Sequence, residues 1–190
     1  MIPDTFEVSS LMCDPSKGKK KGDYCGLCYI GVSGGKVWIR MQLKRIPREQ
    51  LIRNYIDWYY MYQPTYAGIE ANSFQELYSE LINNECAIRS IAPIPIHQIY
   101  NTIPKEIRIR RLGPYLRDNK FRFIKPLSDG TDHIESLRIG ASLLYSQLKD
   151  FPNGQHDDGP DTLEMSIRLI EIMTGEQQQS SHVTPNIVGT

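Results

Sequence analysis

Residues 6–17 read FEVSSLMCDPSK, a mixture of apolar and small polar residues that predicts a β-strand ending at Asp14. Pro15 follows at once and has no N–H to donate, so the hydrogen-bonded ladder stops there. A carboxylate at the end of an internal strand is held where a rigid sheet can aim it at a ligand. An aspartate before a turn is common, so the function of Asp14 depends on what else converges on it.

Length and composition describe one globular domain. The chain has 190 residues, of which 40% are hydrophobic and 23% charged. No apolar run approaches the roughly 18 residues of a membrane helix, and no signal-peptide pattern opens the chain. We therefore expect a cytoplasmic protein without membrane contact, whose four cysteines are reduced core residues. The domain is expected to span 1–175, followed by a polar, flexible tail over 176–190.

Strand and helix signals alternate along the chain. Gly34-Gly35 separates two β-favouring runs, 24–33 and 36–46, which predicts a hairpin and three consecutive antiparallel strands. Leu51, Tyr55 and Trp58 recur at helical spacing within 48–62, more typical of core packing than of base stacking. Further helices are predicted at 73–84, 105–118, 133–149 and 160–173, short strands at 66–70, 88–91 and 121–124, and a proline-rich irregular connection at 92–103. This order predicts an α/β fold, a mixed sheet covered by helices with the first strand central.

Charge is unevenly distributed although the net charge is zero. Residues 1–125 hold 19 Lys and Arg against 12 Asp and Glu, a balance of +7, and residues 126–190 hold 3 against 10, a balance of −7. The asymmetry suggests a basic surface that could meet a polyanion such as DNA, although chance clustering of solvated charges is an alternative. The candidate DNA-binding residues are Lys17, Lys19, Lys20, Lys21, Lys105, Arg108 and Arg111.

Three acidic sites fall at the ends of predicted elements. Asp14 ends the first strand, Glu70 ends the fourth, and the pair Asp157-Asp158 precedes the last helix. Mg²⁺ and Mn²⁺ prefer carboxylate oxygens and keep several waters, so the protein needs to supply only a few acids. Two such ions about 3.5–4 Å apart can promote phosphodiester hydrolysis. We therefore expect these acids to converge on two metal ions.

Each acid also has a plainer explanation. Glu70 could be solvated in a loop, and Asp157 or Asp158 could cap the final helix. Capping explains one acid of HDDGPD, residues 156–161, but not three acids within five residues, which repel one another unless they share a cation. His156 could support the site as a general acid–base or as a hydrogen-bonding neighbour.

Two other motifs resemble a zinc site and a phosphate-binding loop but lack the features that these sites need. Cys25-x-x-Cys28 lies in a predicted strand, where the two side chains point to opposite faces and cannot form half of a zinc site. The basic stretch SKGKKKG, residues 16–22, lacks the Lys-Ser or Lys-Thr of a phosphate-binding loop. The sequence therefore shows no ATPase site of that type.

Four stretches together resemble the C-terminal nuclease domain of the large terminase subunit of tailed bacteriophages, which has a ribonuclease H-like fold. They are MCDPSKGKKKGDY at 12–24, YAGIEANSFQELY at 66–78, KEIRIRRLGPYL at 105–116 and FPNGQHDDGPDTLEMS at 151–166. The resemblance implies a Mg²⁺- or Mn²⁺-dependent endonuclease that cuts concatemeric viral DNA during genome packaging. The implied setting is the cytoplasm of an infected or lysogenic bacterial host.

The resemblance also implies roles for the acids. Asp14 would bridge both ions, Glu70 would hold one and Asp158 the other, with Asp157 close by and Asp161 a weaker candidate. Asp23 matches a recurrent acid of the family that is structural or supports the site. Lys105 and Arg108 match basic positions expected near DNA or near the acidic cluster.

The implied partners are double-stranded DNA and, in a full-length subunit, an ATPase domain, the portal and the small terminase subunit. No ATPase domain is visible in this sequence, so we expect an excised domain or a prophage remnant. Two alternatives remain: another ribonuclease H-like enzyme of the resolvase or transposase type, and a non-catalytic DNA- or capsid-binding module.

Overall fold

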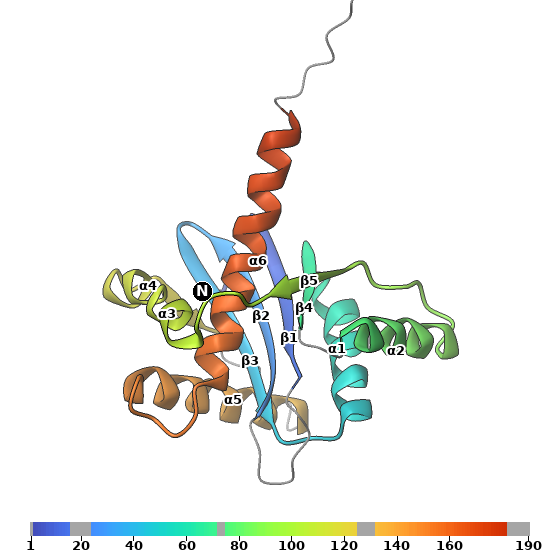
Figure 1. The fold of residues 1–190 in the computed structure, drawn as a ribbon, viewed down its shortest axis with the longest axis horizontal. Coiled ribbons are helices and arrows are strands. Elements are labelled where there is room, and N and C mark those ends of the chain that lie inside the picture. Colours follow the sequence, from blue (N-terminus) through green and yellow to red (C-terminus); the bar gives the residue numbers. More distant parts are fainter. Residues whose placement is uncertain (1, 16–23, 72–74, 125–131, 182–190) are drawn as a thin grey trace, which may run out of the picture.

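The computed structural model describes residues 2–15, 24–71, 75–124 and 132–181. Within these residues one mixed sheet runs through the centre of the molecule in the order β5-β4-β1-β2-β3-β6 (Figure 1). β1 is antiparallel to β2 and parallel to β4, so the predicted internal position of the first strand is confirmed. The strands are β1 (Val8–Asp14), β2 (Cys25–Ser33), β3 (Lys36–Lys44), β4 (Tyr66–Ala71), β5 (Ile96–Tyr100) and β6 (Phe121–Phe123).

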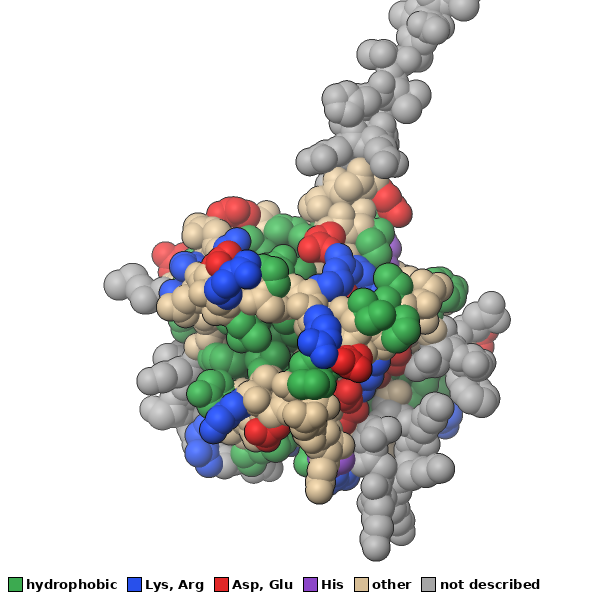
Figure 2. Space-filling view, turned by 60° about the vertical axis from the view of Figure 1, so that its left-hand side comes forward, with side chains coloured by type: hydrophobic (Ala, Val, Ile, Leu, Met, Phe, Trp, Pro, Cys, Tyr) green, Lys and Arg blue, Asp and Glu red, His purple; other side chains and the backbone are tan. Residues whose placement is uncertain are grey.

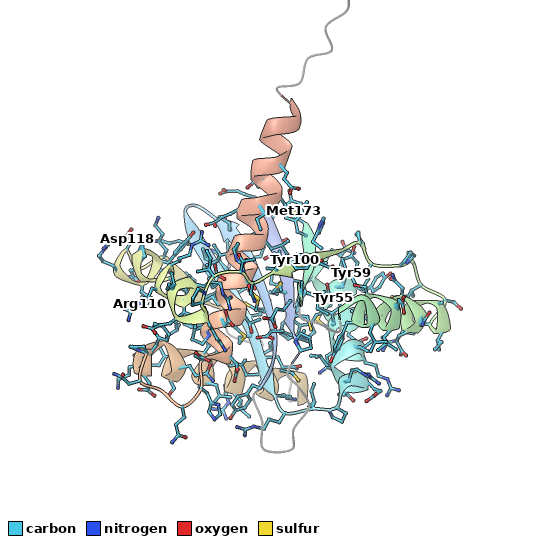
Figure 3. All side chains as sticks on the ribbon, viewed as in Figure 1. Tyr55, Tyr59, Tyr100, Arg110, Asp118 and Met173 are labelled. Carbon is cyan, nitrogen blue, oxygen red and sulfur yellow. The ribbon has the colours of Figure 1, made fainter. Side chains whose placement is uncertain are left out.

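Helices cover both faces of this sheet. In Figure 1, α6 crosses the sheet on one side, whereas α1 and α2 lie beside β4. Figure 3 places Tyr55 and Tyr59 on α1, and Arg110 and Asp118 at the opposite margin of the molecule. No helix among the described residues is both long and apolar enough to cross a membrane. The helices are α1 (Arg48–Tyr62), α2 (Gln75–Ile88), α3 (Lys105–Arg110), α4 (Gly113–Arg117), α5 (Asp132–Asp150) and α6 (Asp158–Ser181).

The alternation of side chains along β1 shows which helices cover each of the two faces of the sheet. Leu11 and Cys13 join the core cluster formed with α1 and α2, whereas Met12 packs with Met165 of α6. Because neighbouring residues of a strand point to opposite faces, Asp14 shares the α6 face with Met12. The aromatic stripe of α1 is core, as predicted, since Tyr55 and Trp58 are 0% and 1% exposed.

The predicted hairpin is confirmed. Gly34 and Gly35 join β2 to β3 with φ angles of 56° and 67°, the left-handed region that glycine enters without strain. The two cysteines of the CxxC motif belong to different core clusters, Cys25 on the α1 face and Cys28 on the α6 face. They are therefore structural residues on opposite sides of the sheet.

The strand predicted at 88–91 is wrong. α2 continues to Ile88, and the following residues form a turn in which Ser90 has a φ of 55°. The true strand is β5, within the stretch predicted to be irregular. Its prolines, Pro93 and Pro95, come just before the strand, and β5 pairs only with β4, so they remove no ladder hydrogen bond.

Two helix boundaries also differ from prediction. The helix predicted over 105–118 is divided into α3 and α4, because Pro114 has no N–H to donate to the preceding turn. The last helix begins at Asp158, two residues before the predicted start, and runs to Ser181. Residues 176–181 of the predicted tail are therefore helical, and 182–190 lie outside the described residues.

α5 packs directly against the backbone of β3. A Cβ atom added to Gly140 would lie 2.0 Å from the carbonyl oxygen of Met41. We expect Gly140→Ala to lower the free energy of unfolding by about 1–3 kcal/mol, because a strand or a helix must move to admit the methyl group. Urea denaturation measures the change. Gly175→Ala, whose Cβ would meet nothing within 4 Å, is the matched control and should not destabilise the fold.

Candidate active site

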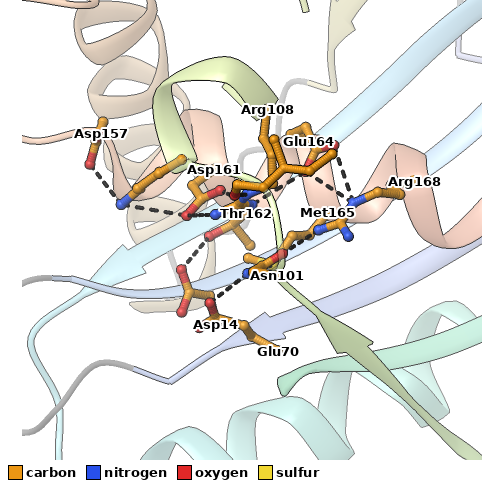
Figure 4. Close-up of polar contacts among 12 residues, drawn as sticks. Asp14, Glu70, Asn101, Arg108, Asp157, Asp161, Thr162, Glu164, Met165 and Arg168 are labelled. Atoms are coloured by element: carbon orange, nitrogen blue, oxygen red, sulfur yellow. Dashed lines mark hydrogen bonds and ion pairs between the residues drawn. The ribbon is translucent and has the colours of Figure 1, made fainter. Parts of the chain in front are cut away.

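Strand register brings Asp14 and Glu70 together. β1 and β4 run parallel with Cys13 opposite Ile69, so the next residue of each strand lies at the same end of the sheet. Ile69 belongs to the core on the α1 face, which turns Glu70 to the α6 face with Asp14. The predicted convergence of these two acids is therefore present (Figure 4).

Burial of Asp14 depends on the approach of α6. Asp14 is 9% exposed, and the Thr162 hydroxyl donates to its Oδ2 atom at 3.4 Å. Opposite Asp14 on β2 stands Gly26, where an added Cβ would lie 2.3 Å from Thr162 Oγ1. The glycine thus lets the first turns of α6 lie directly on the sheet beside the acids.

The Glu70 carboxyl group disfavours the charged form of Asp14. Burial raises the pKa of Asp14 well above its ordinary value, and the negative charge and hydrogen bond of Glu70 raise it further. Asp161 acts in the same direction, and Lys105 opposes it. Mg²⁺ sites commonly use only one or two carboxylates together with water and substrate oxygens. The Asp14–Glu70 pair therefore fits a divalent cation, whose charge would relieve this repulsion.

Asp157, Asp158 and Asp161 form a second acidic group, and its centre is a lysine. The Lys105 ammonium lies 2.7 Å from Asp157 Oδ1, 3.6 Å from Asp158 Oδ1 and 3.5 Å from Asp161 Oδ2. These ion pairs raise the pKa of Lys105, although its burial acts against them. The three closely spaced acids of HDDGPD would repel one another without a shared positive charge, and Lys105 supplies that charge.

Asp158 occupies the first turn of α6, where the helix dipole favours a carboxylate. Its Oδ2 atom accepts a hydrogen bond from the Tyr24 backbone N–H at 3.1 Å. His156 is adjacent, with Nδ1 3.9 Å from the same oxygen and its ring edge-on to the Tyr24 ring. His156 therefore lies beside Asp158, as predicted.

The two acidic groups do not merge into one compact cluster. Among the described residues, no three His, Cys, Asp or Glu side chains stand close enough to hold a single metal ion. The Asp158 carboxylate contacts Lys105 and the Tyr24 backbone N–H. Several predicted site residues lie outside the described part of the chain, namely Lys17, Lys19, Lys20, Lys21 and Asp23.

Arg108 is buried with two acids of α6. Only 4% of it is exposed, and its guanidinium contacts both oxygens of Asp161 and, at 3.4 Å, Glu164. It also donates to the Ile103 carbonyl oxygen at 3.1 Å. A side chain so enclosed offers DNA little surface, and its contacts assign it a structural role. Arg111 and Lys105 retain 48% and 35% exposure of their side chains.

These contacts account for part of the charge asymmetry. The basic residues of α3 and its C-terminal end meet the acids of α6 and the residue before it, so charges far apart in sequence neutralise one another. Figure 2 looks onto the side that carries α3 and α4, and there acidic and basic side chains are interspersed. The structure thus adds an explanation that the sequence did not suggest: complementary ion pairing inside the molecule.

Sequence reasoning missed four polar residues around the acids: Asn101, Thr162, Glu164 and Arg168. Glu164 is 2% exposed and binds three arginines, Arg108, Arg111 and Arg168. A signal was present, since residues 157, 161, 164 and 168 recur at helical spacing. Residue 157 directly precedes α6 in the structure, and the other three lie on the helix.

Removing the Lys105 charge should destabilise the metal-free protein. We expect Lys105→Met to lower the melting temperature at pH 7 in EDTA by roughly 2–4 °C, because three aspartates lose their shared cation. Thermal denaturation measures this shift. Lys36→Met is the control, since it removes one exposed contact with the Asn119 carbonyl oxygen. Equal melting temperatures for the two variants would contradict the role of Lys105.

Searches with family models and among curated proteins give no match to this sequence. Two solved structures of the human cytomegalovirus terminase nuclease domain are similar to it. The Mn-soaked, inhibitor-bound form has a TM-score of 0.64 at 12% identity, with 91% of this chain and 87% of that chain covered. Another has a TM-score of 0.62 at 13% identity, covering 92% and 89%. The predicted resemblance to a terminase nuclease domain is confirmed at the level of the fold.

Proposed function

We propose that this chain is a metal-dependent DNA endonuclease of the terminase type, with Asp14 and Glu70 at its reaction centre. The observation that carries this proposal is the contact of the buried Asp14 carboxylate with the half-buried Glu70 carboxylate at the ends of adjacent parallel strands. A buried acid that is repelled by a neighbouring carboxylate costs stability, and such sites are characteristic of function rather than of packing. The similarity in fold to a nuclease domain supports the same reading.

The acids would hold Mg²⁺ or Mn²⁺, with two ions per site. When bound, the metal would polarise the scissile phosphate and lower the pKa of an attacking water. Asp14 would bridge both ions, a role supported by its contact with Glu70 and by the nearby charge of Asp161. Asp158 is proposed as the third ligand, with Asp157 beside it, and Thr162 keeps Asp14 in place.

Lys105 and Arg111 are proposed to contact the DNA backbone. Lys105 lies beside Asp157, Asp158 and Asp161, Arg111 lies beside Glu164, and both basic side chains keep exposed surface. Phosphate contacts of this kind position a duplex without reading its sequence. Lys17, Lys19, Lys20 and Lys21 follow Asp14 directly in the chain and are proposed to extend this surface.

The biological setting is proposed on the same basis. The substrate would be concatemeric viral DNA, cut during genome packaging in the cytoplasm of an infected or lysogenic bacterial host. An ATPase domain, the portal and the small terminase subunit would be the partners. This setting rests on the sequence resemblance and on the fold, and it goes beyond the chemistry of the acids.

Plasmid nicking tests the proposed activity. Supercoiled DNA incubated with the protein and millimolar Mn²⁺ or Mg²⁺ should become nicked and then linear, and EDTA should stop the reaction. Branched and linear duplexes, compared at equal concentration, distinguish a resolvase from a terminase-type enzyme. Branched DNA cut far faster than linear DNA would favour the resolvase.

One observation favours a non-catalytic module instead. Within the described residues the acids do not gather into one three-ligand cluster, and Lys105 already neutralises three of them. A folded protein that neither cuts DNA nor gains thermal stability with Mn²⁺ would support a DNA- or capsid-binding module. A metal that binds the native state must raise its melting temperature by mass action.

A further inference from the structure

Glu70 is held by an amide whose orientation is itself fixed. Asn101 follows β5, the strand that pairs with β4, and its Nδ2 atom donates to Glu70 Oε1 at 2.7 Å. The same nitrogen lies 3.4 Å from the sulfur of Met165, which therefore lies beside the Asn101 side chain. The acidic residue is thus contacted from the neighbouring strand, on the side away from Asp14.

Arg168 fixes which end of the amide faces the acid. Its Nη2 atom donates to Asn101 Oδ1, and its Nη1 atom donates to the Tyr100 carbonyl oxygen at 3.0 Å. A guanidinium has only donors, so the amide oxygen must face Arg168 and the NH₂ group must face Glu70. Arg168 therefore determines that a hydrogen-bond donor of Asn101 faces Glu70, although these two contacts of Arg168 are with Asn101 and Tyr100.

Arg168 is anchored in turn by a buried acid. Glu164, one turn earlier on α6, accepts from Arg168 Nε at 3.3 Å and is 2% exposed. A continuous chain of polar contacts then runs Glu164–Arg168–Asn101–Glu70 (Figure 4). It ties the position of the Glu70 carboxylate to the placement of α6, the helix that also supplies Thr162 and the second acidic group.

We propose that Asn101 is a positioning residue for Glu70, with Arg168 selecting the amide orientation that presents a donor. The inference rests on the proposed function, in which Glu70 binds a divalent cation. Because Asn101 holds one oxygen of the Glu70 carboxylate, the other oxygen stays oriented toward the cation. Hydrogen-bonding partners of metal ligands typically contribute about 10–100-fold in metal affinity or activity.

Metal titration in three variants tests this assignment. Mn²⁺ binding is followed through the rise in melting temperature, beside the dependence of plasmid nicking on Mn²⁺ concentration. Asn101→Leu removes the donor and should raise the Mn²⁺ concentration for half-maximal stabilisation by about 10-fold or more. Arg168→Met leaves Asn101 in place but releases its amide, and it should produce a smaller shift in the same direction.

Arg111→Met is the matched control. Arg111 binds Glu164, at 3.1 Å, as Arg168 also does, but its second guanidinium nitrogen binds Glu171 rather than Asn101. Because Arg111 is also proposed to contact DNA, this control is read only through the rise in melting temperature with Mn²⁺, which should match that of the wild type. A shift in Arg111→Met as large as that in Arg168→Met would assign the effect to Glu164 and overturn the role of the amide.

A rescue separates positioning from packing. Asn101→Asp has nearly the same shape as asparagine and keeps a partner for Arg168, but offers Glu70 an acceptor. It should weaken Mn²⁺ binding as Asn101→Leu does, whereas Asn101→His, which retains an N–H donor, should recover part of it. If Asn101→Leu titrates like the wild type, the positioning role is wrong while the nuclease stands. If the wild type neither binds Mn²⁺ nor cuts DNA, the proposed function fails and this inference with it.

Discussion

Asp14→Asn is expected to lower the rate of Mn²⁺-dependent plasmid nicking by at least about a thousand-fold. Lewis-acid catalysis is worth several kcal/mol, and each 1.36 kcal/mol corresponds to a factor of ten in rate. Asparagine keeps the shape of the side chain but loses the charge that a divalent cation needs. The measurement is the initial rate of nicking at saturating Mn²⁺ with equal concentrations of the two proteins.

The same substitution should stabilise the metal-free protein, which separates lost activity from lost folding. The pKa of Asp14 is raised in the folded state, by burial first and by Glu70 next. A group with a raised folded pKa contributes its stability below the unfolded pKa and loses it as pH rises through the folded value. At pH 7 in EDTA, Asp14→Asn should therefore unfold at a higher temperature than the wild type.

That difference should vanish in acid. Below about pH 4, the ordinary range of an aspartate, Asp14 is protonated in both states and resembles asparagine. Melting curves from pH 4 to pH 8 follow the effect. Full nicking activity in Asp14→Asn would remove Asp14 from the reaction centre. A variant less stable than wild type at pH 7 would show that the Asp14 charge is satisfied by contacts other than a metal.

Arg108→Met is expected to lower the free energy of unfolding by about 3–5 kcal/mol. Removing one partner of a buried ion pair leaves the other charge uncompensated, which costs far more than the pair contributes. Here the residue left behind is Asp161, 3% exposed, whose carboxyl group Arg108 contacts with two nitrogens and which would retain the partly exposed Lys105 at 3.5 Å. Glu164 is less affected because Arg111 and Arg168 still bind it.

Denaturant unfolding measures this loss, with two comparisons. Arg110→Met is the matched control on the same helix, because Arg110 is 60% exposed and pairs with Glu106 on the surface. It should change stability by less than about 0.5 kcal/mol. The double variant Arg108→Met/Asp161→Leu should recover much of the loss, since the remaining buried charge, Glu164, keeps Arg111 and Arg168 as partners. An Arg108→Met protein within 1 kcal/mol of wild type, on the scale of a surface pair, would mean that Arg108 is not structural.

Local sequence patterns were sufficient to predict most of the strands of the sheet. The hairpin at Gly34-Gly35 is set by the turn itself, and β1 ends where Pro15 removes a donor. Alternation within β3 and helical spacing within α1 are likewise properties of short stretches. The strand at 96–100 was missed because its pairing with β4 is a tertiary contact, while the prolines before it are visible in the sequence.

The sequence by itself determined the strand that carries Asp14, the acids at element ends and the resemblance to a nuclease domain. Only the tertiary structure decided which of those acids meet. Parallel register brought Glu70 to Asp14, whereas α6 turned Asp158 and Asp161 toward Lys105 and Arg108. The physical reason is that a charge is visible in the sequence but its partner is not. Ion pairs and hydrogen bonds act over a few ångströms in space, across up to about 150 residues of chain, as from Asp14 to Thr162.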